Sequence, residues 1–229
     1  MQLPTDRPLI LAHRGARTQA PENTLAAFRL AFEQGADGIE LDVRLAADGE
    51  VVVFHDETLQ RITGIPGRVN RRTLAELKSL DAGAHFSPEF RGERIPTLRE
   101  VFSSLDGRLV YDIELTDYLD LFGPLAERVV RLVREFRLEE RVVITSFNPA
   151  ALRAVRRIAP EFVCGLIAFS GWKGALQRSL IGRMLSRQMI VPHHSDVDRA
   201  YLLRERRRQR KVITWTVNSP EEVRRLAEW

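Results

Sequence analysis

Residues 38–58 read GIELDVRLAADGEVVVFHDET and contain the pattern that decides the fold. Glu40 and Asp42 alternate with apolar residues, so a strand here places both carboxylates on one face and the apolar side chains on the other. Too few residues separate this strand from the apolar residues 51–54 for a parallel crossover, which needs about a dozen. Asp48 and Gly49 instead predict a tight hairpin turn between antiparallel strands.

The hairpin determines which side chains face one another. A turn centred on residues 48 and 49 pairs residues whose numbers sum to 97. His55 is then opposite Asp42, on the same face as Glu40, so three polar groups converge on one patch. The apolar pairs expected on the other face are Val43 with Phe54 and Leu45 with Val52.

Outward from this hairpin, short apolar strands alternate with amphipathic helices along the whole chain. Strands are expected near residues 9–13, 39–43, 51–54, 108–115, 142–147, 162–169, 189–194 and 211–217. This alternation predicts an α/β fold with a parallel sheet, and at 229 residues a TIM (β/α)8-type barrel is favoured over a doubly wound open sheet. No GxGxxG or Walker loop supports the open sheet. We expect one domain, 1–229, with a small excursion at residues 56–108.

Composition limits the classes of function. A hydrophobic content of 44% is that of a globular protein, and no apolar run reaches the roughly 20 residues of a membrane-spanning helix. Cys164 is the single cysteine, which agrees with a cytoplasmic protein. The formal charge of +4 comes mostly from arginine runs such as residues 204–210, typical of a solvated helix face. Without zinc spacing or aromatic–basic interleaving, no nucleic-acid partner is expected.

Polar side chains occur at the ends of three expected strands. Glu114 ends VYDIEL in the same alternating pattern as Glu40 and Asp42, and His13 and Arg14 directly follow the first strand. The carboxyl ends of parallel barrel strands open on one face, where active sites form. Glu40, Asp42 and Glu114 together are therefore candidates to hold one divalent cation, and three carboxylates suit Mg²⁺ or Ca²⁺ better than zinc.

The motifs HRGARTQAPENTLAAF, DGIELDVRLAADGEVVVFHDETLQRITG, YDIEL, VVITSFN and ITWTVN, in this order, closely resemble the glycerophosphodiester phosphodiesterase family over nearly the whole chain. The resemblance implies a phosphodiesterase-type TIM barrel with a small insertion after the third strand. It implies metal-dependent hydrolysis of glycerophosphodiesters to sn-glycerol 3-phosphate and an alcohol. The roles it implies are acid/base catalysis by His13 and His55, phosphate binding by Arg14, a pocket wall at Trp215, and metal binding by Glu40, Asp42 and Glu114.

The chain departs from the family pattern in two places. Thr116 stands where the family usually has a lysine, so one phosphate contact is either missing or supplied elsewhere, with Lys173 and Arg17 as candidates. The family's last short strand has no counterpart before Trp229, so we expect seven parallel strands plus the hairpin partner at residues 51–54.

Three functions remain open from the sequence. The first is the glycerophosphodiesterase; the second is a lysophospholipase D-like activity on acylated lipids; the third is phosphodiester binding without turnover. Residues 172–187 carry an apolar stripe beside arginines. This stripe is expected either to be an outer barrel helix or to make transient contact with an anionic membrane surface.

Overall fold

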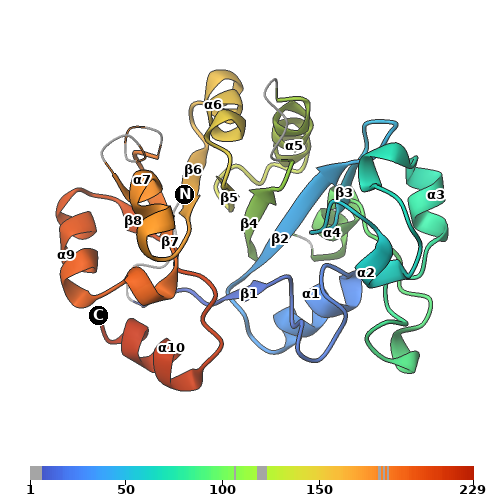
Figure 1. The fold of residues 1–229 in the computed structure, drawn as a ribbon, viewed down its shortest axis with the longest axis horizontal. Coiled ribbons are helices and arrows are strands. Elements are labelled where there is room, and N and C mark those ends of the chain that lie inside the picture. Colours follow the sequence, from blue (N-terminus) through green and yellow to red (C-terminus); the bar gives the residue numbers. More distant parts are fainter. Residues whose placement is uncertain (1–6, 106, 118–122, 180–181, 183, 185) are drawn as a thin grey trace.

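One curved sheet organises the described part of the chain, residues 7–105, 107–117, 123–179, 182, 184 and 186–229 of the computed structural model (Figure 1). Its strand order is β1-β2-β4-β5-β6-β7-β8, all parallel, with β3 antiparallel to β2. The strands are β1 (Leu11–His13), β2 (Gly38–Leu45), β3 (Val51–Val53), β4 (Val110–Leu115), β5 (Val142–Ser146), β6 (Val163–Ala168), β7 (Met189–Pro192) and β8 (Lys211–Val212). Because the parallel strands follow sequence order without a reversal, the barrel-type topology is confirmed over the doubly wound one.

Helices connect successive parallel strands or follow β8, and they lie outside the sheet (Figure 1). They are α1 (Leu25–Glu33), α4 (Leu98–Leu105), α5 (Pro124–Glu135), α6 (Pro149–Ile158), α7 (Ala175–Arg178), α9 (Arg199–Arg207) and α10 (Pro220–Ala227). Thr24 caps α1, since its side chain accepts from the amide of Ala27. None of the helices in the described ranges is both long and apolar enough to cross a bilayer.

The sheet does not close on itself within the described residues. β1 pairs with β2 and β8 pairs with β7, and no ladder joins β8 to β1. Seven parallel strands plus the antiparallel partner β3 are therefore present, as expected. An open edge remains where an eighth parallel strand would complete a barrel.

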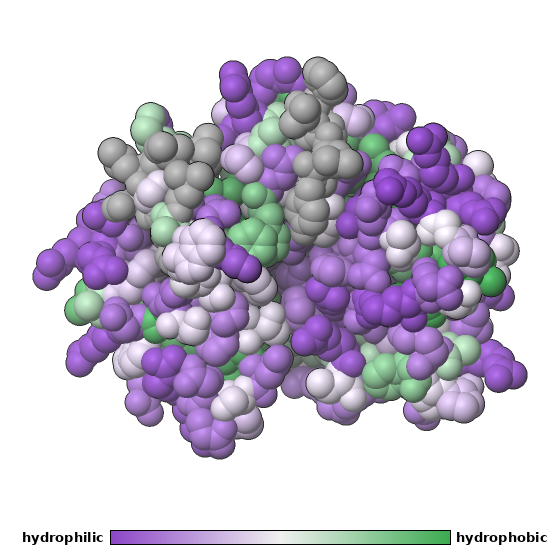
Figure 2. Space-filling view, in the orientation of Figure 1, coloured by the Kyte–Doolittle hydropathy of each residue, from purple (hydrophilic) through white to green (hydrophobic). Residues whose placement is uncertain are grey.

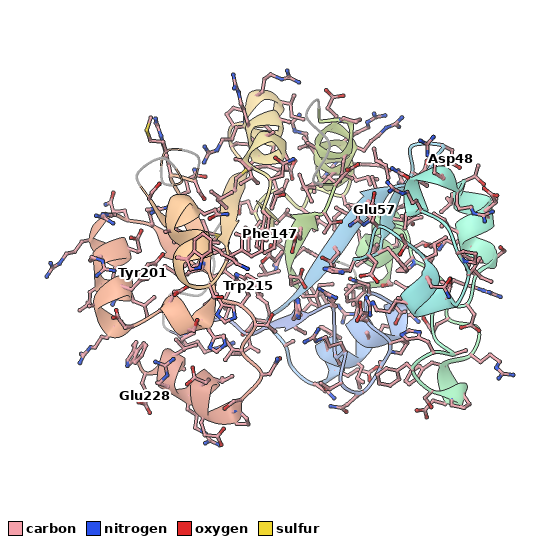
Figure 3. All side chains as sticks on the ribbon, viewed as in Figure 1. Asp48, Glu57, Phe147, Tyr201, Trp215 and Glu228 are labelled. Atoms are coloured by element: carbon pink, nitrogen blue, oxygen red, sulfur yellow. The ribbon has the colours of Figure 1, made fainter. Side chains whose placement is uncertain are left out.

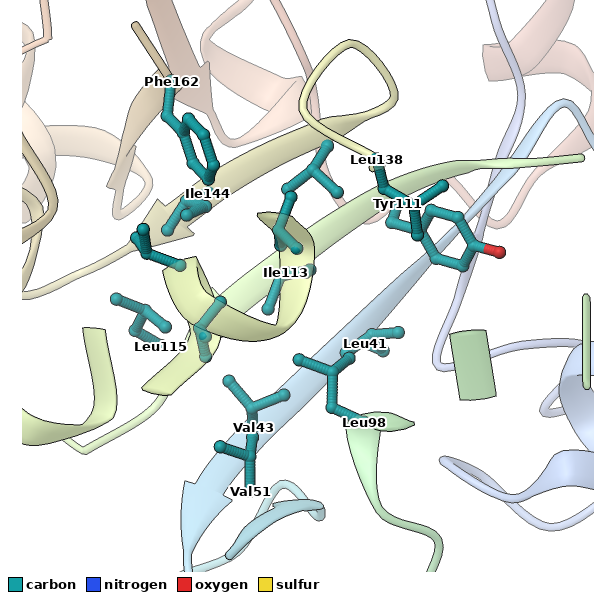
Figure 4. Packing of buried hydrophobic residues seen from close by; sticks show 14 of the residues in the cluster. Leu41, Val43, Val51, Leu98, Tyr111, Ile113, Leu115, Leu138, Ile144 and Phe162 are labelled. Carbon is teal, nitrogen blue, oxygen red and sulfur yellow. The ribbon is translucent and has the colours of Figure 1, made fainter. Parts of the chain in front are cut away.

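The two faces of the sheet carry different side chains. Ile39, Leu41 and Val43 of β2 are fully buried against the helices, and Figure 4 shows this layer continuing through β4 and β5. The alternate residues face the lumen. On β2 and β4 these are Glu40, Asp42, Asp112 and Glu114, whereas β5 to β7 contribute the apolar residues Val143, Ile167, Met189 and Val191. The lumen is thus acidic on one half and apolar on the other.

The predicted hairpin forms, but its predicted register is wrong by one residue. Val43 pairs with Val53 and Leu45 with Val51, so paired numbers sum to 96. The loop is longer than a two-residue turn: the amide of Ala46 donates to the Glu50 carbonyl, and Gly49 adopts a φ of 83°. A three-residue loop ending in a left-handed glycine shifts the pairing, and a shift of one residue exchanges the faces of the second strand.

The residues that change face because of this register shift belong to a second hydrophobic core. Val52 and Phe54 point away from the barrel helices and pack with Leu59, Ile62 and Leu77 of the excursion. The excursion contains α2 (Gln60–Thr63), η1 (Val69–Arg71), α3 (Leu74–Ser79) and η2 (Pro88–Phe90). It lies at the β2 end of the sheet, next to α1 (Figure 1).

The apolar stripe of residues 172–187 is only partly described. Gly171–Gly174 forms the short helix η3, followed by α7, and residues 180, 181, 183 and 185 lie outside the described part of the chain. Trp172 is 84% exposed and Met184 is 59% exposed. Neither side chain lies in the core, so these two residues do not form the buried face expected of an outer barrel helix.

Candidate active site

The strand register brings the three acidic candidates together. Asp42 is the register partner of Glu114 on β4, and Glu40 is the register partner of His13 on β1. Residues in register on adjacent parallel strands project from the same face about 4.8 Å apart. One carboxylate oxygen from each of Glu40, Asp42 and Glu114 lies within 4.8 Å of the others. This cluster is the site predicted from the alternating pattern.

Charge repulsion and burial both affect the pKa of the Glu40 carboxyl group. Burial and the neighbouring charges of Asp42 and Glu114 raise the pKa of Glu40 well above its usual value. Deeper on the same face, burial raises the pKa of Asp112 to about 7, although Thr145 donates a 2.7 Å hydrogen bond to it. Carboxylates gathered in this way are a suitable oxygen donor set for a hard divalent cation, which would neutralise them.

Arg14 holds two sides of the cluster. Its backbone amide donates to Glu40 Oε2 at 3.0 Å, and its Nε lies 3.2 Å from Asp42 Oδ2. Its Nη1 donates to Glu22 at 3.1 Å. Arg14 has a φ of 58°, a left-handed conformation that turns the chain directly after β1. The guanidinium therefore lies beside the carboxylates, at the edge of the cavity.

The two histidines lie on the same cavity wall but in different surroundings. His13 Nε2 is 3.8 Å from Glu40 Oε2. Burial, then the positive charges of Arg14 and Arg17, lowers the pKa of His13 to about 3. His55 is more exposed, and its Nδ1 lies 2.7 Å from Asp56 Oδ1. Because of the register shift, Phe54 rather than His55 hydrogen-bonds to the Asp42 backbone.

Sequence reasoning missed three polar residues that support this site. Asn23 donates from Nδ2 to Asp42 Oδ2 at 2.9 Å and adopts a φ of 57°. Glu22 binds Arg14, and Asp56 binds His55. Each is adjacent in sequence to a predicted residue or lies in the PENT motif, but the sequence alone does not show where these side chains point.

Trp215 lies on the apolar half of the lumen. Its Nε1 donates to the Val191 carbonyl at 3.2 Å, and its ring meets Phe147 edge-on at 5.4 Å and His193 at 5.3 Å. Phe147 in turn stacks on Phe169 at 4.5 Å. Figure 3 shows Phe147 and Trp215 close together near the centre of the molecule. These rings form an aromatic wall of Phe147, Phe169 and Trp215.

Thr116 does not replace the missing lysine. Its hydroxyl donates to the Val43 carbonyl at 2.9 Å, and the residue is buried at the end of β4. Of the two suggested substitutes, Arg17 lines the cavity and lies close enough to lower the pKa of His13. Lys173 is exposed on η3 and is not among the residues lining that cavity.

One cavity of about 1250 Å³ connects these groups. It extends from His13, His55 and Glu114 at the carboxyl ends of the strands to the open edge beside β8. Figure 2 shows hydrophilic residues beside the central hollow on the β2 side and paler or green residues on the β6–β7 side. The arrangement can bind an anion and a cation on one wall while presenting apolar surface on the other.

This combination of an acidic metal-type cluster, two histidines and an arginine at the open face of a barrel-type sheet defines an enzyme class rather than a structural protein. Solved structures with the same fold include an Oleispira antarctica phosphodiesterase in complex with the product sn-glycerol-3-phosphate. That structure has a TM-score of 0.84 and 32% identity, covering 97% of this chain and 90% of the other. A glycerophosphodiester phosphodiesterase from Agrobacterium tumefaciens has a TM-score of 0.83 and 34% identity, covering 96% and 92%.

The sequence comparisons agree with the structural ones. A Caldanaerobacter subterraneus glycerophosphodiester phosphodiesterase is 39% identical over 96% of this chain and 90% of its own length. The model of the glycerophosphoryl diester phosphodiesterase family matches residues 13–229. This chain belongs to the glycerophosphoryl diester phosphodiesterase family and is a phosphoric diester hydrolase.

Proposed function

We propose that this enzyme hydrolyses glycerophosphodiesters to sn-glycerol 3-phosphate and an alcohol, using one divalent cation held by Glu40, Asp42 and Glu114. The observation that carries the proposal is the approach of these three carboxylates to within 4.8 Å of one another. Three carboxylate oxygen donors, with no cysteine among them, favour Mg²⁺ or Ca²⁺. When bound, such an ion supplies charge neutralisation to the non-bridging phosphate oxygens.

His13 and His55 are proposed as the general acid and base. Both line the cavity that Glu40 and Glu114 also line, His13 at the end of β1 and His55 in the segment after β3, so both imidazoles are available to a phosphate bound there. One takes the proton of the nucleophile, and the other returns a proton to the departing alkoxide. The lowered pKa of His13 leaves its ring neutral at pH 7, the form that accepts a proton.

Substrate binding is assigned to the cationic and aromatic walls. Arg14 is oriented by Asp42 and Glu22 and is proposed to bind a non-bridging phosphate oxygen. Arg17 is proposed to supply the positive charge that Thr116 does not. Trp215, packed against Phe147, is proposed as the pocket wall beside the organic part of the substrate.

The test is release of sn-glycerol 3-phosphate from glycerophosphocholine and glycerophosphoethanolamine. Wild-type protein is assayed after EDTA treatment and after addition of Mg²⁺ or Ca²⁺, with Glu114→Gln as the metal-site variant. We expect turnover that EDTA abolishes, that one cation restores, and that Glu114→Gln lacks. Turnover unaffected by EDTA refutes the metal assignment, and product-free binding of the substrate by calorimetry supports a phosphodiester-binding protein instead.

A second candidate function has its own structural support. Phe169 of the aromatic wall is 45% exposed, and Trp172 and Met184, farther along the chain, are more exposed still, so apolar side chains reach solvent in the segment after β6. Such residues favour transient contact with a membrane surface and a lysophospholipase D-like activity on acylated lipids. Faster turnover of lysophosphatidylcholine than of glycerophosphocholine, reduced by Trp172→Ala, supports this alternative; the reverse preference rules it out.

We further propose that residues 1–229 act as one domain in the cytoplasm. The continuous sheet links every parallel strand, and Cys164 is a buried free thiol, as reducing compartments permit. Fractionation of cells expressing the natural gene product tests the location.

A further inference from the structure

A group of ion pairs joins the excursion to the candidate active site. Arg61 lies on the short helix α2, outside every motif position assigned a role above. Its Nη2 donates to Glu22 Oε1 at 2.7 Å, and its Nε donates to Asp56 Oδ2 at 2.6 Å. Further hydrogen bonds from the same guanidinium reach the second oxygen of each carboxylate, at 3.2 and 3.1 Å. Arg61 therefore binds two different carboxylates, each through two contacts.

The first carboxylate leads to His55. Burial opposes ionisation of Asp56, but hydrogen bonds from Arg61 and His55 lower its pKa to about 2. Asp56 is consequently ionised at neutral pH and can only accept a hydrogen bond. The 2.7 Å contact then requires that Nδ1 of His55 carries a proton, so that in the neutral ring the lone pair is on Nε2. Asp56 thus fixes the tautomer and the orientation of the ring.

The second carboxylate leads to Arg14. Glu22 Oε1 accepts from Arg61 at 2.7 Å and from Arg14 Nη1 at 3.1 Å, so one oxygen bridges the two guanidinium groups. Arg14 is held on its other side by Asp42. The orientation of Arg14 beside the metal-type cluster therefore depends partly on a carboxylate that Arg61 holds.

We propose that Arg61 is a positioning residue that orients both His55, through Asp56, and Arg14, through Glu22, for catalysis. The proposal rests on the roles assigned to His55 and Arg14 in the proposed function. It predicts that the general acid/base and the phosphate-binding group are aligned by one side chain of the excursion. Neither role requires Arg61 to touch the substrate.

The solvent exposure of Arg61 distinguishes a positioning role from a structural one. Arg61 has a side-chain exposure of 47%, and single ion pairs at such positions contribute about 0–1 kcal/mol to stability. Loss of its charge should therefore leave the fold intact. Loss of a partner that orients a functional side chain typically reduces activity about 10- to 100-fold. A large effect on turnover with a small effect on melting temperature is the signature of positioning.

The chain offers a matched control in Arg68. Arg68 belongs to the same excursion, is 55% exposed and pairs with Glu57, the residue next to Asp56. That ion pair is not connected to His55 or Arg14 in the described residues. Arg61→Gln and Arg68→Gln thus remove the same charge from the same excursion, but only the first removes the contacts to Glu22 and Asp56.

The experiment compares wild type, Arg61→Gln, Arg61→Lys and Arg68→Gln by kinetics on glycerophosphocholine. We expect Arg61→Gln to lower kcat/KM about 10- to 100-fold, and Arg68→Gln to stay within about twofold of wild type. Arg61→Lys should recover part of the loss, because a lysine retains the charge but cannot bind two carboxylates bidentately. Asp56→Asn should act mainly on kcat and Glu22→Gln mainly on KM, and Arg61→Gln should show both effects.

A second measurement does not depend on turnover. Proteins with ¹⁵N-labelled histidine rings report the tautomer of each imidazole by NMR, with the His55 signals assigned from a His55→Gln variant. In metal-free wild type and Arg68→Gln we expect a protonated Nδ1 at His55; in Arg61→Gln we expect a mixture of tautomers. Melting curves verify that every variant is folded, and Arg61→Lys replaces Arg61→Gln if the latter is not.

The kinetic and NMR measurements distinguish failure of the proposed function from failure of the Arg61 proposal. If wild type shows no turnover, the proposed function is wrong, while the NMR spectra still decide whether Arg61 orients His55. If His55 keeps its wild-type signals in Arg61→Gln, or if kcat/KM of Arg61→Gln equals that of Arg68→Gln, the proposal is overturned.

Discussion

Replacing Glu40 by glutamine tests the electrostatic description of the metal-type cluster. Two unit charges at 4.8 Å, the limit found within this cluster, repel by about 3 kcal/mol at an effective dielectric constant near 20. The raised pKa of Glu40 means that protonation already relieves part of this repulsion. The stability gained by Glu40→Gln in metal-free protein at pH 8 is therefore smaller, about 1–2 kcal/mol. The amide oxygen of glutamine can still accept from Arg14.

The pH dependence has a defined sign. Because the pKa of Glu40 is raised in the folded state, the folded protein binds more protons than the unfolded chain above pH 4.5. Metal-free wild type should lose stability as pH rises from that value through the raised pKa, and Glu40→Gln should not show this loss. The difference between the two proteins should be smallest near pH 4.5 and largest at pH 8.

Calorimetry in EDTA measures the difference in stability between Glu40→Gln and wild type, and calorimetry with metal measures how much the cation stabilises each protein. For a protein of this size about 1 kcal/mol corresponds to 2–4 °C, so Glu40→Gln should melt about 2–8 °C higher than wild type in EDTA. A cation at 100 times its dissociation constant should stabilise wild type by about 2.7 kcal/mol, and the variant should lack this response. Glu135→Gln alters a surface ion pair with Arg99. It should change neither the melting temperature in EDTA nor the stabilisation by the cation. A variant no more stable than wild type in EDTA, or one stabilised equally by metal, refutes the reasoning.

Three further outcomes are expected. His13→Gln and His55→Gln should each lower kcat by about 10²- to 10⁴-fold, measured by product release, because each removes one proton transfer; a loss below twofold contradicts the assignment. Arg17→Gln should raise KM more than it lowers kcat, as loss of a phosphate contact would, and an unchanged KM removes Arg17 as the substitute for the family lysine. Asp112→Asn should stabilise metal-free protein at pH 8 but not at pH 4, since stability is lost as pH rises from 3.8 through the pKa of about 7. Its Thr145 bond is kept, so equal stabilisation at both pH values would contradict that pKa.

The strand order and the metal-type cluster were predictable because each depends on one local periodicity. Alternation along β2 and β4 fixes which side chains share a face, whatever the details of the loops. The barrel-type order follows from repeated strand–helix units.

The hairpin register could not be predicted with the same certainty, because it depends on a loop rather than on a period. Asp48 and Gly49 are compatible with a two-residue turn and with a three-residue loop ending at Gly49, and the two differ by one residue in pairing. The consequence extends to Val52 and Phe54, which belong to the core of the excursion rather than to the barrel. Val52 and Phe54 are apolar, and both the predicted and the observed register bury them, so their residue types do not distinguish the two registers.

The supporting residues were missed for a different physical reason. Glu22 and Arg61 are separated by 39 positions and meet because α2 lies beside the turn that precedes α1, which no short motif reports. Asn23 reaches Asp42 only because the chain turns with positive φ before α1. Charged residues on helices are usually solvated, so the sequence gives no reason to single out Arg61 among 35 lysines and arginines.

The division of the lumen connects these observations to function. β1, β2 and β4 place acidic and cationic groups on one wall, whereas β5, β6 and the segment after β8 place Val143, Ile167 and the ring of Trp215 on the other. A phosphodiester is asymmetric in the same way. The charged phosphate lies on one side of a P–O bond, and an organic substituent lies on the other side. Because neighbouring strands keep a fixed register, the charged wall cannot move relative to the apolar one without breaking the sheet. We therefore expect adjustment to different alcohols to come from the loops after β5 to β8, whereas we propose that the excursion after β3 orients His55 and Arg14 through Arg61.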